Sequence, residues 1–124
     1  MKKVLVIIKP MKEDVTKEVL KMLLGNYEYV CATNEEEALR LLKEGDYAAA
    51  IVAARDFGRL DLNPMLGLVK KVEEHDRSLF DKILVWTFDQ DFYTECKLRG
   101  LSAYMKANTQ SEREFKRAFD ALVG

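Results

Sequence analysis

The apolar run of residues 4–8, VLVII, decides the fold of this chain. Such a run, rich in β-branched side chains and without alternation, is too short for a helix and is typical of a strand covered on both faces. Pro10 blocks continuation of the strand, and apolar residues then recur at spacings of three and four until Gly25. This segment therefore predicts a buried strand followed by an amphipathic helix over residues 11–24.

The same pair of elements recurs along the rest of the chain. We expect further strands over residues 27–32, 48–54, 82–88 and 102–105. We expect further helices from Asn34 to Gly45, over residues 65–74 and 92–99, and from Ser111 onward with Glu114 in capping-box register. The stretch between residues 55 and 64, which contains Asn63-Pro64, reads as looser chain. Strands alternating with helices favour a parallel sheet with right-handed crossovers and helices on both faces.

The composition is that of one globular domain over residues 1–124. Apolar residues make up 48% and charged residues 33%, and 20 basic against 21 acidic side chains give a net charge of -1. This balance excludes disordered and fibrous classes, and it argues against a nucleic-acid reader, which normally carries a basic excess. The longest apolar run, residues 48–54, is too short to span a bilayer. We therefore expect a cytoplasmic protein without nucleic-acid or membrane binding.

Few residues are suited to a metal or a cofactor. Cys31 and Cys96 are far apart and share only His75 as a further soft ligand, so a zinc site is disfavoured and free thiols are expected. In open parallel sheets ligands bind at the carboxyl ends of the strands. A nucleotide or flavin phosphate would require a glycine-rich turn after the first strand, and residues 8–12, IKPMK, contain no glycine.

The layout of nearly the whole chain resembles the receiver domain of bacterial two-component response regulators. The resemblance is carried by residues 3–9 (KVLVIIK), 32–39 (ATNEEEAL) and 42–47 (LKEGDY), by Gly58 and Gly100, and by Thr87 and Tyr104 on the last two strands. It implies a flavodoxin-like (βα)5 doubly wound parallel sheet with strand order 2-1-3-4-5, and a signalling role in a phosphorelay.

Three positions depart from the pattern of that family. Receivers hold magnesium with an acid pair after the first strand and are phosphorylated on an aspartate at the end of the third strand, five residues before a glycine. The resemblance places Ile8 and Lys9 at the pair and, through Gly58, Ala53 at the phosphoacceptor. A lysine ammonium about 4 Å from the metal would repel it by on the order of 8 kcal/mol at an effective dielectric of about 20. We therefore expect a degenerate receiver, or pseudo-receiver, with no cofactor, no metal and no enzymatic activity.

The rest of the degenerate pocket would be formed by Thr87 and Lys106. The family lysine falls on Ala107, so Lys106 stands one place short and could face the other way. Lys9 is either solvated or a tethered cation that pairs with Asp56 or Asp89.

Two further roles stay open. Thr87 and Tyr104 are either ordinary strand residues or a switch pair that repacks the output face. Asp56, Asp61, Asp89 and Asp91 are expected to be loop and helix-start carboxylates, with a displaced phosphoacceptor among them as the alternative.

By the same resemblance, the chain would bind a protein partner or a second copy of itself through its fourth helix, fifth strand and fifth helix. The residues expected on this partner surface are Phe92, Lys97, Tyr104, Lys106, Arg113 and Lys116. Mixed charge suits a reversible contact of fixed register. The alternatives are a flavodoxin-like domain that binds a small ligand, and an interaction domain belonging to a longer regulator.

Overall fold

Five parallel strands form one sheet in the order β2-β1-β3-β4-β5. The computed structural model describes residues 2–54, 59–106 and 108–124, without the side chains of residues 54 and 59–64. The strands are β1 (Lys3–Ile7), β2 (Glu28–Ala32), β3 (Ala49–Ala54), β4 (Ile83–Thr87) and β5 (Ser102–Met105). The helices are α1 (Glu13–Leu24), α2 (Glu35–Glu44), α3 (Arg59–Asp76), the 3-10 helix η1 (Arg77–Lys82), α4 (Gln90–Leu98) and α5 (Thr109–Val123). The predicted fold class and strand order are confirmed.

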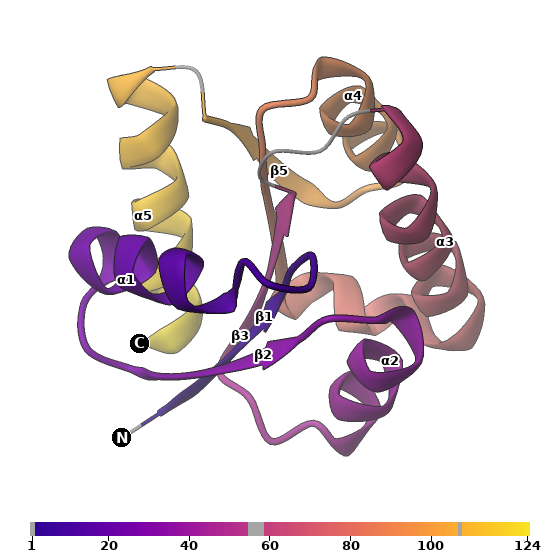
Figure 1. Cartoon of the computed structure of the whole chain (residues 1–124), viewed down its shortest axis with the longest axis horizontal. Coiled ribbons are helices and arrows are strands. Elements are labelled where there is room, and N and C mark those ends of the chain that lie inside the picture. The colour runs from indigo at the N-terminus through magenta and orange to yellow at the C-terminus, as the bar shows by residue number, and fades with distance from the viewer. Residues whose placement is uncertain (1, 55–58, 107) are drawn as a thin grey trace.

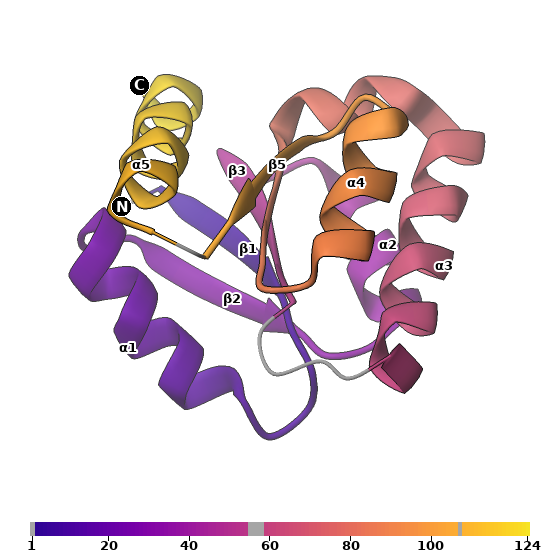
Figure 2. The same ribbon diagram turned by 90° about the horizontal axis from the view of Figure 1, so that it is seen from above.

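The helices cover both faces of the sheet. Helices α1 and α5 lie against one face, and α2, α3 and α4 lie against the other (Figures 1 and 2). Residues 4–8 are buried, as expected of a strand covered on both sides. Val4, Val6 and Ile8 pack under α1 and α5, whereas Leu5 and Ile7 pack under the other three helices. This alternation follows from the period of two in a strand, which sends successive side chains to opposite faces.

Three helices start earlier than the sequence indicated, and α4 does so by two residues, at Gln90. Helix α3 begins at Arg59 and contains Pro64, so it forms in spite of the loss of one backbone donor. Helix α5 is capped by Asn108, whose side chain accepts from the Ser111 N–H at 2.8 Å, so Ser111 lies inside the helix. The expected cap at Asn34 is confirmed, because its side chain accepts from the Glu37 N–H. Gly45 ends α2 with φ 70°, a left-handed conformation that glycine adopts without strain.

Among the helices that the structure describes, none is long and apolar enough to cross a membrane.

Candidate functional site

The carboxyl ends of β1 and β3 present apolar side chains. Ala53 is 0% exposed and, like Ile8, packs in the cluster beneath α1 and α5. Lys9 follows β1, is partly exposed, and accepts the Lys12 N–H through its carbonyl oxygen. The strand register pairs Ala53 with Trp86 and Ala54 with Thr87, so two alanines of β3 lie beside the last two residues of β4. Within the residues that the structure describes, these strand ends therefore supply no carboxylate.

Thr87 is fully buried at the end of β4 and serves the start of α4. Its Oγ1 accepts from the Asp89 N–H at 3.0 Å, and the Asp89 side chain accepts from the Phe92 N–H at 2.8 Å. Asp89 thus caps α4, which agrees with its expected structural role. Asp56 and the side chain of Asp61 lie outside the described residues. The pairing of Lys9 with Asp56 or Asp89 stays a prediction.

Lys106 extends from the end of β5 over two aromatic rings. Its Nζ lies 4.4 Å from the centroid of the Trp86 ring and 5.1 Å from that of Phe88, and both distances are in the range of cation–π attraction. Its backbone N–H donates to the Thr87 carbonyl oxygen at 2.9 Å. By strand alternation the side chain of Thr87 faces away from that of Trp86. Thr87 and Lys106 are therefore joined through the backbone, while their side chains take opposite sides of the sheet.

Tyr104 lies on the same side as Lys106, in register with Trp86. Its ring packs against Phe115 at a centroid distance of 5.9 Å, and burial, followed by the Glu114 carboxylate, raises the pKa of its hydroxyl. The proposed coupling of Thr87 with Tyr104 would have to pass through the β4–β5 pairing, because the side chain of Thr87 faces the other side of the sheet.

One residue of the expected partner surface was placed wrongly. Phe92 is 2% exposed and belongs to the core beneath α2, α3 and α4, because its position in the first turn of α4 faces the sheet. Lys97, Arg113 and Lys116 are exposed, and Tyr104 and Lys106 are half-buried. The described surface of α4, β5 and α5 thus carries mixed charge, because the exposed acids Asp91, Glu112 and Glu114 lie on the same two helices.

The arrangement of Trp86, Phe88 and Lys106 was not anticipated as a unit. Trp86 and Phe88 stand two residues apart, and so do Tyr104 and Lys106, which is the spacing that places side chains on one side of a sheet. Their common spacing on adjacent strands was the signal that could have identified this cluster.

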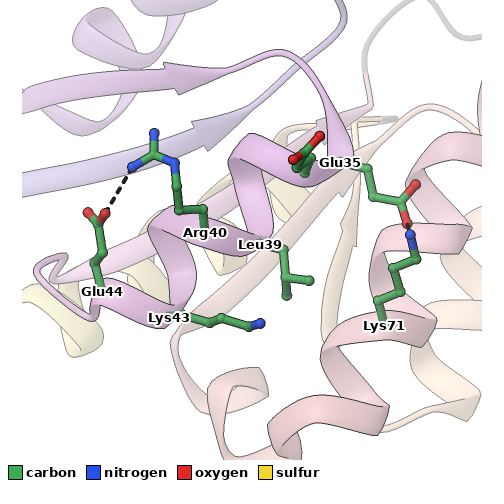
Figure 3. Close-up of a pocket in the computed structure, with 7 residues that line it drawn as sticks. Glu35, Leu39, Arg40, Lys43, Glu44 and Lys71 are labelled. Atoms are coloured by element: carbon green, nitrogen blue, oxygen red, sulfur yellow. Dashed lines mark hydrogen bonds and ion pairs between the residues drawn. The ribbon is translucent and has the colours of Figure 1, made fainter.

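A cavity of about 690 Å³ lies elsewhere, on the outer surface of α2 and α3 (Figure 3). Its charged walls neutralise one another, because Arg40 pairs with Glu44 at 2.9 Å and Lys71 pairs with Glu35 at 2.8 Å. The hydrogen bond to Glu35, followed by the charge of that carboxylate, raises the pKa of the Lys71 ammonium. A surface groove with paired charges does not present a convergent set of groups to a ligand, and we place no site there.

Among the residues that the structure describes, no three His, Cys, Asp or Glu side chains come together in a way that could hold a metal ion. His75 is exposed, as expected. Cys31 and Cys96 are both free thiols, partly buried and buried respectively.

The sheet order and the helix arrangement are those of the flavodoxin-like fold, which response-regulator receiver domains share. No protein-family model matches the chain, and no curated protein matches its sequence. Solved structures do match over the full length.

Three of these structures illustrate the likeness. A chain from the complex of the histidine kinase ThkA with the response regulator TrrA has a TM-score of 0.68 and 22% identity, with 100% of both chains covered. The receiver domain of a sensor histidine kinase from Pseudomonas aeruginosa, solved with magnesium in its active-site cleft, has a TM-score of 0.68 and 16% identity, over 99% of this chain and 98% of that one. The chemotaxis response regulator CheY4 of Vibrio cholerae has a TM-score of 0.64 and 20% identity, over 95% and 98%. At these identities the likeness establishes the fold.

Proposed function

We propose that this chain is a single receiver-like signalling domain of a two-component response regulator that works without aspartyl phosphorylation. The observation that carries the proposal is the apolar edge of the sheet at Ile8 and Ala53, within a receiver fold. An alanine side chain offers no oxygen to phosphorylate, and the register extends this to Ala54, the residue beside Thr87. Lys9 adds a positive charge where the family pattern has an acid that binds magnesium.

The proposed activity is protein binding, with no catalysis and no cofactor. The basic side chains of Lys97, Arg113 and Lys116 on α4 and α5 are exposed and would contact an acidic region of a partner or of a second copy. A structural neighbour comes from a complex of a histidine kinase with a response regulator, which supports a protein partner for a domain of this fold.

Intact-mass measurement after incubation with magnesium and acetyl phosphate tests the proposal. We expect the mass to stay unchanged, while a control receiver that carries an aspartate at the end of its third strand gains one phosphoryl group under the same conditions.

Two variants locate any phosphoryl group that does appear. Asp56→Ala and Asp89→Ala remove the two acids nearest the strand ends in sequence. A mass gain in the parent chain that disappears in either variant overturns the proposal and assigns a displaced phosphoacceptor. Circular dichroism of both variants checks that the fold is kept.

A further inference from the structure

A cavity that the proposed function does not use opens between α1 and α5. It measures about 330 Å³, and its lining includes Val19, Trp86, Phe88, Lys106 and Glu112. An adjoining hollow of the same volume shares Val19, Trp86 and Glu112 and continues toward the carboxyl-terminal half of α1. Together they form one recess, here called the α1–α5 recess, in the size range of small-ligand sites.

Apolar side chains form one part of the lining of the recess, beside the polar Asn108, Thr109 and Glu112. Val15 and Met22 on α1 are 56% and 87% exposed, and Phe88 is 57% exposed. Val15, Val19 and Met22 are spaced by four and three residues, so they form one stripe of α1 that leads into the recess. Grouped apolar exposure of this kind marks a place where an apolar group binds.

The floor of the recess holds a polar atom that lacks a partner. Trp86 is only 7% exposed, and its indole Nε1 has no hydrogen-bond acceptor among the described residues. A buried donor without an acceptor is unfavourable, and most such groups in proteins are satisfied. An acceptor supplied by a bound molecule would remove this penalty.

The charges around this donor favour an anionic acceptor. The Lys106 ammonium lies over the Trp86 ring, and Thr109, in the first turn of α5, lines the same recess, where the helix dipole is positive. Glu112 opposes an anion, but its side chain is exposed, so solvent and salt screen its charge.

We propose that the α1–α5 recess binds an apolar group that carries a carboxylate. The apolar part contacts Val19, Met22 and Phe88, and the carboxylate accepts from the Trp86 Nε1–H and pairs with Lys106. The carboxylate belongs either to a free acid or to the end of a peptide, and the two sources are separated below. The site is independent of the phosphorylation test, because that test addresses the ends of β1 and β3.

The emission of Trp86 reports binding directly, because this is the only tryptophan of the chain. We expect octanoate to change the emission saturably and to bind about tenfold or more tightly than 1-octanol, since a charged acceptor strengthens the hydrogen bonds. Octylamine, which has the same tail and a positive head, should bind most weakly. Equal binding of all three molecules, or tightest binding of octylamine, overturns the proposal.

Variants of the charged residues sharpen the test, with calorimetry as a readout that does not depend on the fluorophore. Lys106→Met should weaken octanoate binding about tenfold, and Glu112→Gln should strengthen it. Lys97→Met is the matched control, because Lys97 also lies over an aromatic ring, 5.8 Å from that of Tyr93, but outside the recess. Equal losses for the two lysine variants contradict the assignment, provided that circular dichroism shows both to be folded.

A short acetylated peptide ending in leucine separates the two sources. If its free carboxylate competes with octanoate and its amide does not, the site accepts peptide ends. If octanoate binds and neither peptide competes, the site takes free acids. If carboxylate and amide compete equally well, the proposed role of the anion is wrong.

Discussion

The two faces of the sheet are built from the same five strands but are closed in different ways. Beneath α2, α3 and α4 the core is mainly aliphatic. Beneath α1 and α5 the core also holds a cluster of aromatic rings, with Trp86 stacked on Phe115 at 4.9 Å and Tyr27 edge-on to Phe119 at 5.2 Å. The aromatic face also carries the exposed stripe on α1 and the recess above Trp86. The proposed carboxylate site would therefore lie on the face that carries the aromatic cluster.

Truncation of one large side chain on each face should show this difference most strongly. Phe115 is fully buried and contacts both Trp86 and Tyr104, so Phe115→Ala should lower the free energy of unfolding by about 4 kcal/mol. Leu68 is its counterpart on the aliphatic face, and Leu68→Ala should cost about 3 kcal/mol. Urea unfolding followed by circular dichroism measures both. A larger loss for Leu68→Ala than for Phe115→Ala would contradict the expectation that the aromatic stack contributes more to the free energy of unfolding.

A smaller effect is expected from alkaline pH, because each face holds a weak acid whose burial raises its pKa to about 12. Burial raises the pKa of the Cys96 thiol from 9.0 to about 12, with a further contribution from Glu95. Burial raises the pKa of the Tyr29 hydroxyl from 10.0 to about 12, with a further contribution from Tyr27. The unfolded chain therefore loses these protons first, so their contribution to stability is complete below pH 9 and is lost between pH 9 and pH 12.

Single variants separate the two contributions. Cys96→Ala should remove the part of the decline that begins at pH 9, and Tyr29→Phe the part that begins at pH 10. Urea midpoints measured across this range give both slopes. Because the residues lie on opposite faces, the effects should add in the double variant. An unchanged slope in both variants would assign the decline to other groups.

The sequence pattern was sufficient for the strands of the sheet, because buried strands leave continuous apolar runs such as residues 4–8. The order of the strands was implied by the resemblance to receiver domains. It misjudged the start of α3, since Pro64 is a strong break signal that tertiary packing overrides. It also placed Phe92 on the surface, because a family layout gives the position of a helix without the rotation of each side chain. Ile8 and Ala53 could be assigned to one edge of the sheet, since parallel strands end together. The recess could not be predicted, because it depends on the spacing between α1 and α5.

The smallest expected effect tests whether the contrast between the faces extends to the helix ends. Asn34 caps α2 on the aliphatic face and Asn108 caps α5 on the aromatic face, each accepting a backbone N–H three residues on at 2.8 Å. Because this geometry is the same, Asn34→Ala and Asn108→Ala should each lower the free energy of unfolding by about 1 kcal/mol, and glycine at either position by only a few tenths.

Urea unfolding of the two pairs of variants measures these losses. Equal losses would place the difference between the faces in the side chains that pack on the sheet and not in the helices themselves. A markedly larger loss at Asn108, which also lines the recess, would instead indicate that the start of α5 depends on the packing around Trp86. In that case Phe115→Ala and Asn108→Ala should be non-additive, because both changes would act on the same aromatic cluster.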